Sequence, residues 1–282
     1  MGTKMVELLS KLITSSKEAS LDILVLQFTI VNAFMVGKPD KASDWILVDT
    51  GLENSADFII ESAEKRFGES SRPQAIILTH GHFDHIGSLI KLSNHWDIPV
   101  YAHELELPYI TGNKDYPMGD PSVGGGMVAE MSPSFPHTSI DIGYRANPLP
   151  SDQSIPGLPG WKWILTPGHT EGHIALFRDS DRILIPGDAF TTVKQESLLS
   201  VITQNEQISG PPAYLTTDWV AAETSVKRLR DLKPSLVIPS HGQPMQGEEL
   251  RRHLDMLSHD FKEIAVPDQG RFVDRTDHPS ST

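Results

Sequence analysis

The stretch THGHFDHIG at residues 79–87 places three histidines and one aspartate within six positions. Imidazole nitrogens and carboxylate oxygens are the donors that zinc takes in proteins when cysteine is absent. The apolar run AIIL at 75–78 precedes the stretch, and IGSLI at 86–90 follows it. This pattern predicts a buried strand, a polar turn and then a helix. The end of a rigid strand is a good place for metal ligands, so the turn is a candidate metal site. The alternative is a polar turn whose histidines share no role.

Four other apolar segments also end in a polar side chain beside a glycine. They are ILVDTG with Asp49, WILTPGH with His169, ILIPGD with Asp188 and LVIPSHG with His241. Mixed folds commonly place their chemical groups at the carboxyl ends of strands, along one edge of a sheet. Taken alone, each of the three later residues fits a structural role better than metal binding. Taken together with the histidine turn, they predict one set of metal ligands.

Local patterns predict most of the remaining elements. Asp218 is expected to cap a helix in which Glu223 supports Lys227 four positions on. Residues 4–18 are expected to form a short amphipathic helix. Strands are expected within 22–36 and at 45–48, 74–79, 98–101, 163–165, 174–177, 183–185 and 236–238. Helices are expected at 54–67, from the histidine turn to about 95, at 218–232 and at 248–264.

The segment 104–160 differs from the rest, because its 57 residues contain nine prolines and eight glycines. Long loops within compact domains are usually functional. We therefore predict a lid or wall over the histidine turn; the alternative is an insertion that only packs against the domain. Tyr109 and Phe135 of this segment, with Phe190 near Asp188, are predicted to contact the apolar part of a substrate. The predicted organisation is one domain at 1–265, including this insertion, and a polar C-terminal tail at 266–282.

Composition restricts the classes of partner. The chain has 282 residues, a net charge of −13 and no cysteine. An acidic chain is a poor match for nucleic acid or an anionic membrane, so we expect a small-molecule substrate and neither of those partners. The absence of cysteine excludes disulfides and fits a reducing compartment. With no evident signal-peptide core or membrane-spanning run, we expect a soluble, cytoplasmic protein. The oligomeric state is left open.

The order of the polar residues resembles that of the metallo-β-lactamase superfamily, over roughly residues 22–245. The resemblance implies an α+β fold, a four-layer αβ/βα sandwich of two mixed β-sheets with helices outside. It also implies two zinc ions per chain, although other divalent metals are possible. Asp49 matches a family residue that orients a ligand, and the spacing of His173 from His169 predicts a similar role. The implied ligands are His80, His82 and His169 for one ion, Asp84, His85 and His241 for the other, and Asp188 bridging both.

The same resemblance implies a metal-dependent hydrolase that uses a hydroxide bridging the two zinc ions, with Asp84 orienting it and carrying a proton. Asp188 stands where the family's zinc β-lactamases have Cys or Ser, which disfavours β-lactam hydrolysis. Thr191 stands where similar lactonases have a tyrosine, so lactonase activity loses that support. The chain also lacks the basic modules of the family's RNA-processing nucleases. The expected substrate is a carboxylic ester, lactone or thioester. The alternatives are a phosphodiester or organophosphate hydrolase, and a non-catalytic small-molecule sensor.

Overall fold

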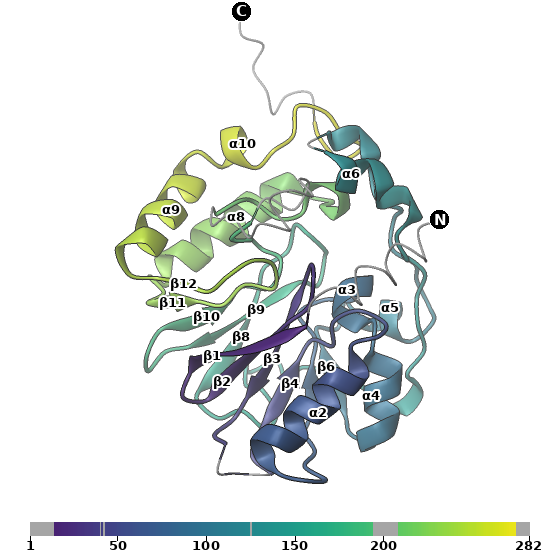
Figure 1. Cartoon of the computed structure of the whole chain (residues 1–282). Helices are drawn as coiled ribbons and strands as arrows, with labels where there is room; N and C mark the ends of the chain where they lie inside the picture. The colour runs from purple at the N-terminus through teal and green to yellow at the C-terminus, as the bar shows by residue number, and fades with distance from the viewer. Residues whose placement is uncertain (1–13, 40, 42, 125, 194–207, 275–282) are drawn as a thin grey trace, which may run out of the picture. The chain divides into compact units, whose positions relative to one another are not determined.

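The computed structural model describes residues 14–39, 41, 43–124, 126–193 and 208–274. These residues form two mixed β-sheets, of seven and five strands, together with helices (Figure 1). The α+β fold class predicted from the sequence is therefore confirmed. The described residues fall into two compact units, whose boundaries follow Tyr116, Phe135 and Ile164. The first unit contains the chain up to residue 116 and residues 136–164, and the second contains 117–135 and the chain from 165. The predicted single domain at 1–265 stays a prediction.

The first unit contains the seven-stranded sheet, in the order β1-β2-β3-β4-β5-β6-β7. Neighbours from β1 to β4 are antiparallel, and neighbours from β4 to β7 are parallel. Every residue of β3, β4 and β5 is buried, as expected for the centre of a sheet. The strands are β1 (Ser15–Ser20), β2 (Ile23–Gln27), β3 (Asn32–Val36), β4 (Ile46–Val48), β5 (Ile76–Ile77), β6 (Val100–Ala102) and β7 (Ala146–Pro148).

The helices of the first unit bury apolar side chains at helical spacing. In α2, Ile59, Ala63 and Phe67 recur every four residues and are all buried. The ring of Phe67 stacks on Trp45 with 4.5 Å between ring centroids. This packing places α2 next to the start of β4, the strand that leads to Asp49. The helices are α2 (Ala56–Phe67), α3 (Phe83–Ile86), α4 (Leu89–Trp96), α5 (Leu107–Ile110) and the 3-10 helix η3 (Gly143–Arg145).

The second unit contains four strands of the five-stranded sheet, whose order is β12-β11-β10-β9-β8. The remaining strand, β8 (Trp161–Leu165), contains the boundary between the two units, which follows Ile164. The pair β10 and β11 is parallel, and β10 pairs with β9 antiparallel, as does β11 with β12. The other strands are β9 (Ile174–Arg178), β10 (Ile183–Ile185), β11 (Leu236–Val237) and β12 (Met245–Gln246).

The long helix α8 begins as the sequence predicts. The side chain of Asp218 accepts a hydrogen bond from the N–H of Ala221 at 2.9 Å, and Lys227 pairs with Glu223. The predicted final helix at 248–264 is interrupted at Asp260, which separates a helix that ends at His259 from one that spans Phe261–Ile264. The helices of this unit are α6 (Met127–Met131), α8 (Trp219–Asp231), α9 (Gly247–His259), α10 (Phe261–Ile264), and the 3-10 helices η1 (Pro121–Val123), η2 (Ser132–Ser134) and η4 (Ala213–Leu215).

The helix predicted at residues 4–18 is wrong for the part of it that the structure describes. Residues 15–18 were expected in a helix, but they belong to strand β1. This strand is mostly exposed and has no apolar alternation, and it is held by backbone pairing with β2, from Ser15 opposite Gln27 onwards. Residues 4–13 of the predicted helix lie outside the described residues. No helix within the described ranges combines the length and apolar character needed to cross a bilayer.

Candidate metal centre

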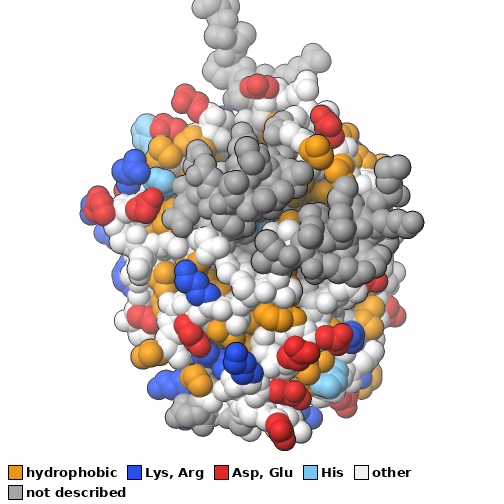
Figure 2. Space-filling view, in the orientation of Figure 1, with side chains coloured by type: hydrophobic (Ala, Val, Ile, Leu, Met, Phe, Trp, Pro, Cys, Tyr) orange, Lys and Arg blue, Asp and Glu red, His pale blue; other side chains and the backbone are white. Residues whose placement is uncertain are grey.

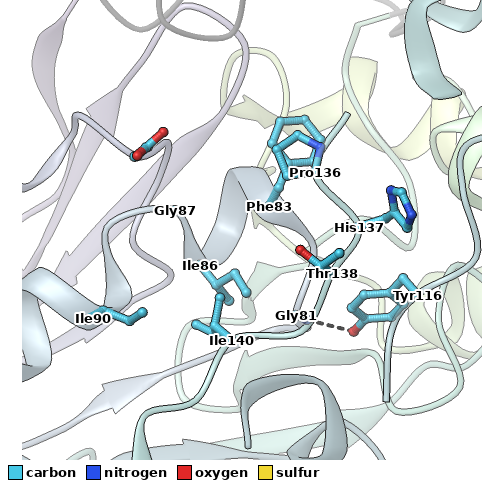
Figure 3. A pocket seen from close by; sticks show the side chains of 11 residues that line it. Gly81, Phe83, Ile86, Gly87, Ile90, Tyr116, Pro136, His137, Thr138 and Ile140 are labelled. Carbon is cyan, nitrogen blue, oxygen red and sulfur yellow. Dashed lines mark hydrogen bonds between the residues drawn. The ribbon is translucent and has the colours of Figure 1, made fainter. Parts of the chain in front are cut away.

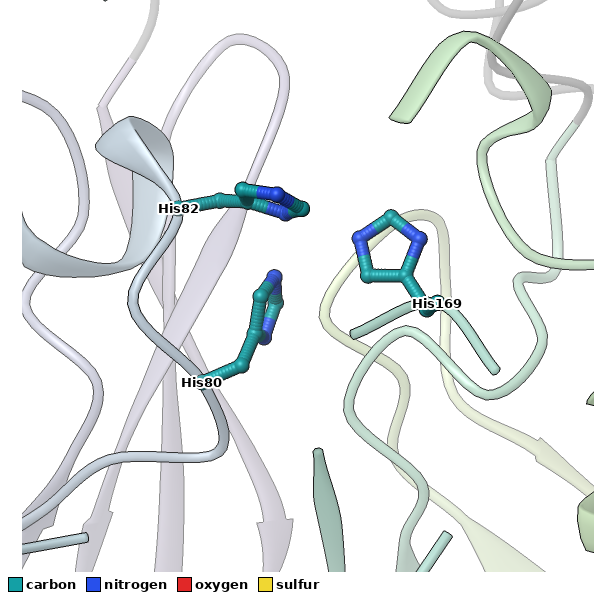
Figure 4. A group of neighbouring side chains, drawn as sticks. All are labelled: His80, His82 and His169. Atoms are coloured by element: carbon teal, nitrogen blue, oxygen red, sulfur yellow. The ribbon is translucent and has the colours of Figure 1, made fainter. Parts of the chain in front are cut away.

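The histidine turn of the first unit brings four potential metal ligands together. His80 and His82 lie on the turn after β5, and their ring centroids are 4.7 Å apart. Figure 4 shows both imidazoles extending from this turn. His82 occupies the N-cap position of α3, which carries Asp84 and His85 in its single turn. All four side chains are buried. Buried histidines and carboxylates this close together are expected where a metal ion is bound.

Asp49 organises two of these histidines from the end of β4. Its Oδ1 accepts a hydrogen bond from the backbone N–H of Thr79, at 2.8 Å. Its Oδ2 accepts the Thr79 hydroxyl at 2.8 Å and lies 2.8 Å from Nδ1 of His85. The hydroxyl of Thr79 donates its proton to Asp49. The hydroxyl oxygen of Thr79 can therefore accept a hydrogen bond from Nδ1–H of His80, 3.1 Å away. We assign both histidines the tautomer with the proton on Nδ1, which presents Nε2 as the metal donor.

Close backbone contacts hold the Asp49 loop against α3. The backbone N–H and the hydroxyl of Thr50 donate to the carbonyl of His85, at 2.7 and 2.8 Å. The N–H of Gly87 donates to the carbonyl of Gly51 at 2.9 Å. A Cβ at residue 87 would lie only 2.4 Å from the backbone nitrogen of Glu53, so a side chain there would force the loop away. Gly87 therefore allows the loop after Asp49 to pack closely against the end of α3, which positions Asp49.

The second unit contributes His169, Asp188 and His241, all buried. Figure 4 also shows His169, which follows β8 in the chain. Its Nδ1 lies 3.1 Å from the hydroxyl oxygen of Thr216, and that hydroxyl donates to the carbonyl of Pro212 at 2.8 Å. The oxygen can therefore accept Nδ1–H of His169, which leaves Nε2 as a donor for a metal. Oδ2 of Asp188 lies 3.1 Å from Nε2 of His241 and 3.4 Å from Nε2 of His169. One carboxylate thus faces two imidazole nitrogens within this unit.

His173 holds the backbone that carries Asp188. Its Nε2 accepts the backbone N–H of Asp188 at 2.8 Å, and its Nδ1 lies 3.1 Å from the carbonyl of Thr166. Gly187 makes this contact possible, because its φ is +57° and a Cβ there would lie 2.5 Å from Nε2 of His173. The structure therefore places His173 where it can orient a candidate ligand through the main chain.

The predicted substrate contacts are buried side chains packed against aromatic neighbours or the core. Tyr109, in the first unit, stacks on Tyr116 with 3.7 Å between ring centroids. In the second unit, Phe135 meets Tyr214 edge-on at 5.9 Å, and Phe190 is fully buried. Their contact with a substrate stays a prediction.

Sequence reasoning does not predict the support that Glu106 and Tyr116 give to the histidine turn. The backbone N–H of Gly81 donates to Glu106 and to the hydroxyl of Tyr116, each at 3.0 Å. The Tyr116 hydroxyl in turn donates to Glu106. Burial, assisted by the charge of Glu106, raises the pKa of Tyr116 well above its usual value, so the phenol keeps its proton. No local pattern marks Glu106, because its role depends on a contact 25 positions away along the chain.

Comparisons with known proteins agree with this arrangement. The family model described as the metallo-β-lactamase superfamily matches residues 26–241, and the chain belongs to this superfamily. A probable metallo-hydrolase of Bacillus subtilis (strain 168), YflN, is 44% identical over 247 residues, covering 88% of this chain and 94% of the relative.

Two solved structures show the fold. The BLEG-1 B3 metallo-β-lactamase is similar at a TM-score of 0.56 and 23% identity, covering 80% of this chain and 94% of that one. TTHA1623, solved in a di-iron-bound form, is similar at a TM-score of 0.53 and 23% identity, covering 88% of this chain and 97% of that one. The chain therefore has the α+β sandwich fold of this superfamily, as the sequence resemblance implied.

The donor chemistry fits a divalent metal. Across the described residues of the two units, side chains that could hold an ion are His80, His82, Asp84 and His85 in the first and His169, Asp188 and His241 in the second. Imidazole and carboxylate donors suit zinc and iron alike. Together with family membership, these clusters imply a metal-dependent hydrolase.

Proposed function

We propose that the chain is a dinuclear zinc hydrolase of carboxylic esters, lactones or thioesters. In this proposal His80, His82 and His169 bind one ion, and Asp84, His85 and His241 bind the other. Asp188 bridges the two. This assignment is supported by the donor chemistry within each unit and by membership of the superfamily.

The observation that best supports the proposal is the hydrogen bonding of Asp49. Its carboxylate lies 2.8 Å from Nδ1 of His85 and accepts the hydroxyl of Thr79, which lies 3.1 Å from Nδ1 of His80. Metal-binding histidines usually donate their second ring N–H to a carboxylate or another polar acceptor, which fixes the ring and its tautomer. The same relation holds for His169 and Thr216. A purely structural cluster has no need for this shared arrangement.

A side chain of the protein itself can supply the proton transfer that hydrolysis requires. When bound, two divalent cations supply activation of water and polarisation of the bond under attack. Asp84 lies in the first turn of α3, with its Oδ1 3.9 Å from Nε2 of His85, and is placed to hold and transfer a proton. No serine or threonine nucleophile is needed.

Charge favours an uncharged substrate over a phosphodiester. The chain has a net charge of −13, so its overall field repels anions. On the described part of the face in Figure 2, lysines and arginines are interspersed with acidic side chains. The five strand-end motifs that supply Asp49 and the candidate ligands contain no lysine or arginine. A neutral acyl compound meets no such repulsion.

The test compares substrate classes on the zinc-loaded protein. We expect kcat/KM for p-nitrophenyl acetate, a thioester or a lactone to exceed that for bis-p-nitrophenyl phosphate. His80→Ala should abolish turnover, and the matched exposed control His95→Ala should leave it unchanged. A clear preference for the phosphodiester would favour the alternative hydrolase. Metal binding without turnover of any of these substrates would favour a sensor.

A further inference from the structure

A cavity of about 260 Å³ lies within the first unit, beside the histidine turn (Figure 3). Part of its wall comes from α3 and α4. Phe83 and Ile86 lie three residues apart on α3, and Ile90 lies in the first turn of α4; all three line the cavity. Another part comes from the chain around residues 136–140, where the side chain of Ile140 lies beside Ile86 (Figure 3). The lining is therefore mainly apolar.

The cavity reaches the backbone between two candidate metal ligands. Gly81, which separates His80 from His82, lines it. Tyr116 lines it as well, and its ring lies 4.4 Å from the ring of His82, centroid to centroid. The Tyr116 hydroxyl is fixed by Gly81 and Glu106, so this wall is held in place. A group bound in the cavity would lie next to the histidine turn.

The size and charge of the cavity indicate what it can hold. Ligand pockets usually measure about 300–1,000 Å³, so this cavity suits part of a small molecule. The charged side chain on its lining is the carboxylate of the exposed Glu53, and the lining also includes the imidazole of His137. A hydrocarbon chain would gain from burial against Ile86, Ile90 and Ile140. A carboxylate or phosphate would meet the negative charge of Glu53.

We propose that this cavity binds the aliphatic acyl chain of an uncharged ester, and that Ile140 sets the length of chain accepted. This inference rests on the proposed function, because it assumes that the ester carbonyl reacts at the ions held by the histidine turn. The leaving group then remains outside the cavity. Esters with a medium-length acyl chain are the preferred substrates.

The experiment fills the cavity and measures the ratio of two activities. Ile140→Trp places a larger side chain on the lining, and Thr138→Trp does the same from an exposed position. Val220→Trp, on exposed α8 surface of the second unit, is the matched control. For each protein, kcat/KM is measured with p-nitrophenyl octanoate and p-nitrophenyl acetate. We expect both cavity variants to lower the octanoate-to-acetate ratio about tenfold or more through KM, and the control to leave it unchanged.

Binding of octanamide, an uncharged probe, separates this inference from the proposed function. Calorimetry should detect octanamide binding to the native chain and weaker binding to both cavity variants. If neither ester is hydrolysed but octanamide binds and the variants weaken it, the hydrolase proposal fails and the acyl-chain site stands. If both esters are hydrolysed and neither variant changes the ratio or the binding, the acyl-chain site is excluded and the hydrolase proposal stands.

Discussion

The carboxylate of Glu106 accepts a hydrogen bond from the backbone N–H of Gly81 at 3.0 Å. Gly81 separates His80 from His82, so Glu106 fixes the main chain between two candidate metal ligands. Glu106 is fully buried, and Tyr116 donates to the same oxygen. A buried carboxylate needs such donors, and the turn gains a rigid support in return. Groups that support ligands in this way affect metal affinity even though they never touch the ion.

We therefore expect Glu106→Ala to weaken zinc binding on the order of tenfold, measured by competition with a chelator. Glu106→Gln keeps an oxygen acceptor for Gly81 and should lose less affinity. Glu104→Ala removes an exposed carboxylate two positions away and serves as the control. Circular dichroism would verify that each variant is folded. Native affinity in a folded Glu106→Ala variant would show that the turn does not depend on this contact.

A second prediction concerns the number of metal ions. The proposed ligands divide into three, three and one shared carboxylate, so each chain should bind two divalent ions. His85→Ala and His241→Ala should each weaken one ion selectively, because both belong to the same proposed site. Metal analysis after zinc reconstitution and gel filtration measures the number of zinc ions bound per chain. Fewer than about 1.5 equivalents in the native chain would contradict two sites, after allowance for ordinary losses.

The strand ends could be predicted from the sequence because hydrophobic runs and glycines are local features. The runs before Asp49, His80, Asp188 and His241 correspond to β4, β5, β10 and β11. Burial of whole strands produces continuous apolar runs, which are easy to recognise. Asp49 was identified for the same reason, since it directly follows such a run.

Other features depend on tertiary contacts and leave no local pattern. Strands β7 and β12 have only three and two residues, and backbone pairing with a neighbour defines them. The predicted insertion at 104–160 contributes β7 to the first sheet and Glu106 to the support of the histidine turn, so these parts of it belong to the fold. These contacts join residues far apart in the chain, which hydrophobic periodicity cannot reveal.

A third prediction concerns the nucleophile. Asp84→Asn should lower kcat about 100-fold or more, because an amide cannot carry the proton that the carboxylate transfers. Asp57→Asn changes an exposed aspartate of α2 and is the control. Since water is the proposed nucleophile, mass spectrometry of the protein quenched during turnover should show no acyl adduct. An adduct on any serine or threonine would overturn the mechanism.

The last prediction concerns His103, a nearly buried histidine outside the candidate metal centre. Its Nδ1 accepts the backbone N–H of Leu105 at 3.3 Å, and its ring meets Trp163 at 5.4 Å between centroids. Burial lowers the pKa of His103 below its usual 6.5, and the opposing effect of Glu104 is smaller. The unfolded chain therefore takes up this proton at a higher pH than the folded chain. The stabilisation is complete above about pH 6.5 and is lost as the pH falls from there through the folded-state pKa.

His103→Asn tests this dependence, because an asparagine oxygen can accept the N–H two residues on without titrating. We expect the free energy of unfolding of the variant to fall less steeply between about pH 7 and pH 5 than that of the native chain. His95→Asn, at an exposed position in α4, is the control. Urea unfolding of the metal-free proteins at several pH values measures the difference, and the other histidines contribute equally to each series. Parallel curves for the native chain and His103→Asn would mean that His103 titrates alike in the folded and unfolded states.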